Sequence, residues 1–112
     1  MNKTAPRGEP YIRYIAFEQI ACQALKSSEF IVRRWLPEGC RQGTEWVSRN
    51  PRRNDHRPGS FKINLATGRW GDFAIEDAGS DLISLAAYLF GLSQGEAATR
   101  VAEMLGIDPY ER

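Results

Sequence analysis

The residues best suited to chemistry in this sequence are cationic side chains grouped in the middle of the chain. Five fall within nine residues and two more lie on the segments that follow: Arg49, Arg52, Arg53, His56, Arg57, Lys62 and Arg69. Cations neutralise phosphates, and Trp46 and Trp70, which lie among them, have rings on which unpaired bases can stack. The pattern is typical of a surface that binds single-stranded nucleic acid.

The same residues have a simpler interpretation, in which the aromatic rings form the buried face of a sheet and the arginines keep its edge soluble. Alternation along residues 60–64 places Phe61 and Ile63 on one face and Lys62 and Asn64 on the other. We therefore expect Phe61 in the core. For the cationic face the sequence favours contact with nucleic acid, with Trp46 or Trp70 open for stacking.

The overall charge conceals this basic region. The chain carries a formal net charge of +1, yet residues 30–70 hold nine basic side chains against three acidic ones. A basic surface raises the local concentration of phosphate whatever the total charge of the protein is. The remainder of the chain is therefore acidic overall, and an anionic partner is expected at the middle of the sequence.

Catalytic groups are poorly supported by the sequence. His56 is the one histidine, and the arginines around it disfavour its use as a general base. No glycine-rich phosphate loop of the Walker type is present. We expect no catalytic residue, and hence no enzyme activity in the chain itself.

Metal binding is also poorly supported. The two cysteines, Cys22 and Cys40, are too few for a disulfide framework and lie far from His56 in sequence. Four acidic residues are close enough in sequence to suggest a magnesium site, which takes oxygen ligands: Asp72, Glu76, Asp77 and Asp81. Asp81 is better explained as the cap of the helix that follows it. We expect neither a metal nor a cofactor.

The elements that must position these residues form an α+β pattern. Apolar periodicity and capping residues predict helices over residues 15–25, 28–36, 82–90 and 93–105, with Ser27 or Ser28 capping the second. Alternation and turn residues predict strands over 45–49, 60–64 and 68–73. We expect a small antiparallel three-stranded sheet flanked by an N-terminal helical hairpin and two C-terminal helices.

The length of 112 residues fits one domain. We expect a flexible arm over residues 1–13, a single module over 14–106, and a tail or the start of a linker over 107–112. No apolar stretch is long enough to span a membrane, and residues 1–7 lack the apolar block of a secretory signal. These features predict a cytoplasmic protein with no membrane partner.

Several short motifs follow one another in a distinctive order along residues 35–105. They include Trp35-Leu36-Pro37-Glu38-Gly39, Glu45-Trp46-Val47, Pro58-Gly59-Ser60-Phe61 and Gly79-Ser80-Asp81-Leu82-Ile83. This arrangement resembles the N-terminal zinc-binding domain of bacterial-type DNA primases, most of all the version found in primase-helicase proteins of phages and mobile elements. In zinc-bearing members, a Cys-x-x-His pair precedes a Pro-Ser-Phe strand and a Cys-x-x-Cys pair precedes a Gly-Asp-Val-Ile helix start.

The zinc ligands of that family are missing here. When the Pro-Ser-Phe strand and the Gly-Asp-Val-Ile helix start are aligned with this sequence, the four zinc-ligand positions fall on Asn50, Arg53, Phe73 and Glu76. The guanidinium of Arg53 and the phenyl ring of Phe73 do not bind zinc. The resemblance therefore implies a zinc-ribbon-like fold without its metal. We expect Phe73 to fill the vacated space and an Arg53–Glu76 ion pair to span it.

The resemblance also implies a function. It predicts a non-catalytic module that holds single-stranded DNA, or RNA, for template recognition, beside a primase catalytic domain or a helicase. Such a module is either a stand-alone factor or part of a longer primase-helicase. The alternative is a protein-interaction module in a replication complex, which docks through Trp35 and residues 88–90.

Overall fold

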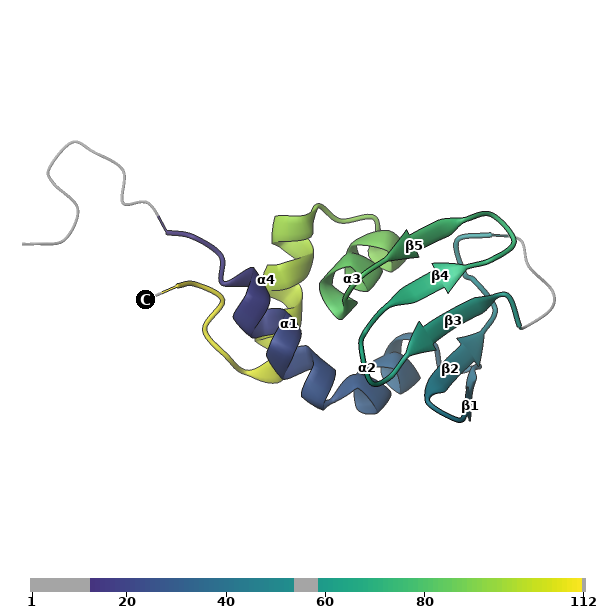
Figure 1. The fold of residues 1–112 in the computed structure, drawn as a ribbon. Helices are drawn as coiled ribbons and strands as arrows, with labels where there is room; N and C mark the ends of the chain where they lie inside the picture. Colours follow the sequence, from purple (N-terminus) through teal and green to yellow (C-terminus); the bar gives the residue numbers. More distant parts are fainter. Residues whose placement is uncertain (1–12, 54–58, 112) are drawn as a thin grey trace, which may run out of the picture.

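The computed structural model describes residues 13–53 and 59–111. Their elements follow the chain in this order: α1 (Phe17–Lys26), α2 (Ser28–Trp35), β1 (Cys40–Gln42), β2 (Glu45–Ser48), β3 (Phe61–Asn64), β4 (Trp70–Asp72), β5 (Asp77–Gly79), α3 (Leu82–Phe90) and α4 (Gln94–Leu105). The fold is α+β, as predicted, with the strands between two N-terminal and two C-terminal helices in sequence (Figure 1).

The sheet has five strands rather than the three predicted. Each strand pairs antiparallel with its neighbour in the order β1-β2-β3-β4-β5. The two missed strands are edge strands of three residues each, and β1 is exposed throughout. Such short strands show no apolar alternation, so their sequences resemble turns. Gly43, with φ of 63°, closes the tight turn that pairs β1 with β2.

One face of the sheet carries the core. Trp46 lies opposite Ile63, and Ile63 lies opposite Trp70, so these side chains form a row across β2, β3 and β4. Together with Phe61 they join a single buried cluster with the apolar residues of all four helices. The expected alternation of β3 is confirmed, because Phe61 and Ile63 are buried while Lys62 and Asn64 are only partly so.

The C-terminal helices begin and end where the sequence predicts. The Asp81 carboxylate accepts the N–H of Ser84 at the start of α3, which confirms its role as a cap. Ser93 and Glu96 form the predicted capping box of α4. At α2, Ser27 occupies the predicted N-cap position, but its side chain makes no capping hydrogen bond. The Ser28 hydroxyl instead donates to the Leu65 carbonyl, 2.7 Å away, and so ties α2 to the turn after β3.

The segment before α1 lies against the end of the chain. The N–H of Ala16 donates to the Pro109 carbonyl at 2.9 Å, and the N–H of Glu111 donates to the Tyr14 carbonyl at 2.8 Å. Ile15 and Tyr110 form an isolated antiparallel bridge. The expected arm over residues 1–13 lies almost wholly outside the described residues. Among the residues described, no helix has both the length and the apolar character needed to cross a membrane.

Candidate nucleic-acid interface

The sheet distributes the predicted cations over three places. The end of β2, the start of β3 and the end of β4 meet at one end of the sheet, so Arg49, Arg52 and Arg53 lie there. Lys62 lies within β3, and Arg69 precedes β4 at the opposite end. At about 3.3 Å per residue, the two ends of β3 are about 10 Å apart. His56 and Arg57 lie outside the described residues.

The three arginines at the loop end already have partners. Arg49 forms an ion pair with Glu38. Arg52 donates to the carbonyl of Tyr88, 2.9 Å away near the end of α3, where a cation also complements the helix dipole. Arg53 Nε donates to Asp72 Oδ2 at 2.8 Å. These contacts fasten the loop after β2 to the rest of the fold, so a phosphate there must compete with them.

A buried polar network lies beneath these arginines. Asn50 and Asp72 are each 1% exposed. The Asn50 amide donates to Asp72 Oδ2 and to the Tyr88 hydroxyl, both at 2.8 Å. The Tyr88 hydroxyl donates in turn to Asp77 at 2.8 Å. Burial and the neighbouring carboxylates raise the pKa of Tyr88, so its hydroxyl keeps the proton that it donates.

Asp72 is the charged centre of this network. Burial alone raises the pKa of a carboxyl group, because a desolvated charge is costly. Here hydrogen bonds from Asn50, from the N–H of Ala74, from Arg53 and from Ser60 outweigh burial and hold the pKa of Asp72 below its ordinary value. Asp72 is therefore a carboxylate that joins the loop after β2 to the end of β4.

The expected replacement of a metal by Phe73 and an Arg53–Glu76 pair was wrong. Phe73 is 72% exposed, because alternation along β4 directs it away from the core face that Asp72 occupies. Arg53 binds Asp72 instead, which is nearer the core than the exposed Glu76. In the described part of the chain, no three histidine, cysteine or acidic side chains are grouped so that they could hold a metal ion.

The prediction that Trp46 or Trp70 stacks on bases also needs correction. Trp46 is 2% exposed and its indole N–H donates to the Leu36 carbonyl at 3.0 Å. Trp70 is 6% exposed and its indole N–H donates to Ser84 Oγ at 3.0 Å. Both rings belong to the core, so neither offers an open face to a base.

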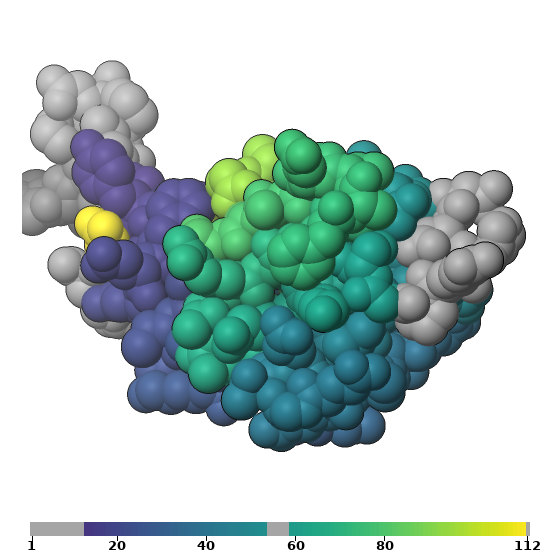
Figure 2. Space-filling view, turned by 45° about the vertical axis from the view of Figure 1, so that its right-hand side comes forward, coloured from purple at the N-terminus to yellow at the C-terminus, as the bar shows by residue number. Residues whose placement is uncertain are grey.

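The opposite face of the sheet is open at Ala78 and Phe73, whereas Val47 and Gly71, which also lie on it, are buried. Lys62, Gly71 and Ala78 lie side by side on it, in register across β3, β4 and β5. Phe73 follows in the same alternation, and the Lys62 ammonium lies 5.8 Å from the centroid of its ring. In the view that brings the sheet forward, the teal and green residues of the strands fill the middle of the surface, and the purple residues of α1 stay at its left edge (Figure 2).

Gly71 is unusual at the centre of this face. Its φ is not positive, and a Cβ there would meet only Asp77 O at 3.5 Å and Ala78 Cβ at 3.7 Å, which are ordinary contacts. Glycine within a strand costs about 0.5–1 kcal/mol relative to alanine. Gly71 is itself buried, so neighbouring atoms of the fold already cover its backbone.

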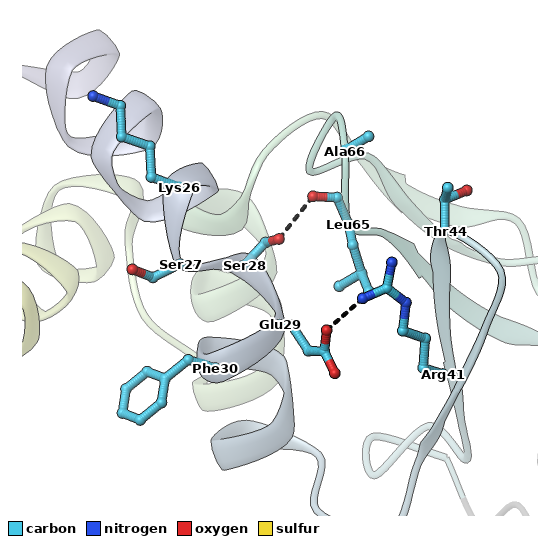
Figure 3. Close-up of a pocket in the computed structure, with 9 residues that line it drawn as sticks. All are labelled: Lys26, Ser27, Ser28, Glu29, Phe30, Arg41, Thr44, Leu65 and Ala66. Carbon is cyan, nitrogen blue, oxygen red and sulfur yellow. Dashed lines mark hydrogen bonds and ion pairs between the residues drawn. The ribbon is translucent and has the colours of Figure 1, made fainter.

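A second hollow lies between the start of α2 and the turns of the sheet, and it is not suited to an anion. Figure 3 shows Lys26 and Phe30 pointing away from it, whereas Glu29 faces Arg41. The Glu29 carboxylate accepts from Arg33 at 2.6 Å and from Arg41 at 2.5 Å, and these bonds hold its pKa below the usual value. Arg41, the cation that faces this hollow, is therefore already paired within the fold.

The chain matches no protein-family model, and no curated protein matches it. The resemblance to primase zinc-binding domains consequently depends on the short motifs of residues 35–105. Sequence reasoning assigned Lys62 and Arg69 to the interface but missed Phe73. The signal that could have found it is the alternation of residues 70–73, in which Trp70 and Asp72 point inward while Gly71 and Phe73 point outward.

Proposed function

We propose that the chain is a non-catalytic module that binds single-stranded DNA, or RNA, and takes part in template recognition by a replication primase or primase-helicase of a phage or mobile element. The observation that carries this proposal is the exposed Phe73 ring beside Lys62, on a sheet face that the helices leave open. The motifs of residues 35–105 connect the surface to primases.

The open face has the parts that single-strand binding requires. An unpaired base stacks on Phe73, a contact worth about 1–3 kcal/mol per base in proteins of this kind. Ala78, exposed and small, leaves room for the sugar-phosphate backbone. Lys62 neutralises a phosphate there, since its contact with Glu45, at 4.0 Å between exposed groups, is weak. Arg69, exposed and on the same side by alternation, extends the positive surface.

The polar network supports a zinc-ribbon-like origin without the metal. Asn50 and Arg53 occupy two positions where the family resemblance places zinc ligands. Both bind Asp72, which directly precedes a third such position at Phe73. The hydrogen bonds thus join the two loops that a metal joins in the zinc-bearing domains. This arrangement keeps the end of the sheet closed and leaves Phe73 free for the surface.

The test is binding of a fluorescein-labelled oligo-dT, followed by fluorescence anisotropy, with oligo-rU as the RNA comparison. We expect Phe73→Ala to weaken binding by about fivefold to a hundredfold, the loss of one stacked base. Phe30→Ala is the matched control, because Phe30 is 62% exposed on α2, away from the open face. It should leave the affinity unchanged.

Two outcomes would contradict the proposal. One is an affinity for oligo-dT that Phe73→Ala and Phe30→Ala change equally. The other is the absence of binding to either oligonucleotide by a folded sample at low salt. Circular dichroism of each variant verifies that the fold is intact, and an exposed ring is removed at little cost to stability.

A second candidate function is a docking module, and one observation favours it. Phe90 is 53% exposed and packs edge-on against Trp35, with ring centroids 5.7 Å apart. Tyr88 belongs to the polar network instead, so only part of the surface predicted over residues 88–90 is open. Docking through apolar side chains predicts little effect of salt, unlike binding of nucleic acid.

A further inference from the structure

A broad hollow lies between the start of α1 and the segment that follows α4. Its described walls come from residues 15–23 and 107–111, and its volume is about 940 Å³. The backbone hydrogen bonds of Ala16 and Glu111 and the bridge between Ile15 and Tyr110 hold the two segments together. Pockets for drug-sized ligands are usually about 300–1,000 Å³, so this hollow has room for several side chains of a peptide.

The charged side chains of this hollow are acidic. Glu18, Asp108 and Glu111 line it, and none of its described lining residues is a lysine, an arginine or a histidine. Glu18 and Glu111 are exposed and form no ion pair with a described residue. Two positive groups of the described chain adjoin the hollow: the Arg13 guanidinium, and the start of α1, where the helix dipole is worth about half an elementary charge. The three carboxylates outweigh them, so the hollow is negative.

Aromatic rings lie beside these carboxylates. Phe17, at the start of α1, is 42% exposed. The Arg13 guanidinium lies 3.9 Å from the centroid of the Tyr110 ring, so a cation already stacks on one ring of this wall. A guanidinium is attracted to the face of an aromatic ring and binds a carboxylate through two hydrogen bonds. The hollow thus combines the two kinds of group that bind an arginine side chain.

We infer that this hollow binds a basic peptide segment of a partner protein, one that carries arginine residues and an apolar side chain. One arginine of the peptide lies over the Phe17 ring and pairs with Glu18, and a second basic residue pairs with Glu111. Ile15 and Ile107, which are half-buried in the hollow, receive the apolar side chain. The opposite charges of the hollow and the peptide select the partner.

The hollow is separate from the surface proposed for nucleic acid. Figure 1 shows the start of α1 and the C-terminus together at the left of the molecule, whereas strands β3 and β4 lie to the right. The negative charge of the hollow also repels phosphates. A basic peptide and a nucleic acid therefore bind at different places, and neither contact requires the other.

Binding of a fluorescein-labelled synthetic peptide at low salt, followed by fluorescence anisotropy, is the test. The peptide has about ten residues, with arginine and leucine separated by glycine and serine. We expect Glu18→Gln/Glu111→Gln to weaken binding by about twofold to thirtyfold, the loss of two exposed ion pairs. Glu76→Gln/Glu103→Gln is the matched control, because it removes two exposed charges outside the described lining of the hollow. It should leave the affinity unchanged.

Amide chemical shifts of the ¹⁵N-labelled protein locate the peptide without any variant. Addition of the unlabelled peptide should move the signals of residues 15–19 and 107–111, which line the hollow. The signals of β3, over Phe61–Asn64, should stay in place. Shifts confined to the sheet would overturn the inference.

Four further results would also overturn it. If the two double variants bind the peptide equally well, the carboxylates of the hollow do not hold it. If a peptide with glutamine in place of arginine binds with the same affinity, the hollow selects no charge. If Lys3→Glu/Arg7→Glu strengthens peptide binding, the N-terminal residues of the chain itself compete for the hollow, and no partner is needed. If a folded sample binds oligo-dT but not the peptide, this inference fails and the proposed function stands.

Discussion

Trp70 begins β4 and Phe73 directly follows its last residue, yet the two rings lie on opposite sides of the sheet. Trp70 is 6% exposed and its N–H is satisfied by Ser84, whereas Phe73 is 72% exposed. Both are aromatic residues close to cations in sequence, so composition alone does not distinguish the buried core ring from the exposed one. Alternation separates them, because an odd number of residues reverses the side of a strand. We therefore propose Phe73, and not a tryptophan, as the ring on which a base stacks.

Asp72 is the residue whose change tests the polar network. Asp72→Asn removes the anion that Arg53 and Asn50 bind, so the partly buried Arg53 guanidinium loses its ion pair with this carboxylate. We expect the free energy of unfolding to fall by about 2–4 kcal/mol, which lowers the Tm by more than about 8 °C in a domain of this size. Thermal denaturation of the wild type and the variant measures this change in Tm. Glu103→Gln, on the exposed side of α4, is the control; equal stability of the two variants would contradict this role.

The same carboxylate makes stability depend on pH. Its pKa is lower in the folded protein than in the unfolded chain, so Asp72 adds stability above the unfolded value, about 3.9. That contribution is lost as the pH falls below about 4 and through the folded pKa. Wild-type protein should therefore lose stability more steeply than Asp72→Asn in acid. The measurement is the free energy of unfolding of both proteins as the pH is lowered. Equal losses of stability in acid would contradict the role given to Asp72.

At the scale of elements, the sequence determined best what local interactions build. Capping residues and apolar spacing fix α3 and α4, and their structures match the expectation to within a residue. The edge strands β1 and β5 were not predictable, because three exposed residues acquire strand geometry from their neighbour in the sheet. The cations of the candidate site were predicted from the sequence, but the partners of Arg49 and Arg53 were not. Those partners are set by tertiary contacts, which no local sequence pattern encodes.

Strand β4 supplies the prediction that belongs to this scale. Gly71→Val adds a β-branched side chain at a buried position on the face opposite the core, where a Cβ meets only ordinary contacts. The variant should be as stable as the wild type or up to about 1 kcal/mol more stable, because valine favours strands. Its affinity for oligo-dT should nevertheless fall, because the added side chain blocks approach to the sheet.

Gly71→Ser is a useful comparison for that variant, since it adds a smaller side chain. We expect its affinity to lie between those of the wild type and Gly71→Val. Chemical denaturation and anisotropy of the same samples separate the two effects. A loss of both stability and binding in Gly71→Val would show that the glycine serves the fold alone.

On the scale of the whole molecule, the cations around the sheet fall into two groups. At the loop end of the sheet, arginines bind acceptors of the protein itself, such as Glu38, Asp72 and the Tyr88 carbonyl. On the open face, Lys62 and Arg69 make no close contact with a buried acid. The net charge of +1 therefore says little about binding, and the arrangement of charges decides it.

Salt dependence distinguishes a sheet-face site from one that uses the entire basic region. For single strands, the logarithm of the binding constant falls against the logarithm of the salt concentration with a slope of about −0.7 per neutralised phosphate. Lys62 and Arg69 alone predict about −1.4, a loss of about sevenfold between 50 and 200 mM salt. Contact by all six lysine and arginine side chains predicted from the sequence gives about −4, a loss of a few hundredfold.

We expect the smaller slope, because the contacts of Arg49 and Arg53 within the fold hold those side chains away from a ligand on the open face. Lys62→Gln should reduce the slope by about 0.7, because one phosphate contact is lost, while Lys26→Gln at the end of α1 should leave it unchanged. Anisotropy titrations at four salt concentrations give all three slopes. A slope near −4 that Lys62→Gln does not alter would place the nucleic acid at the arginines between β2 and β3 in sequence, rather than on the sheet.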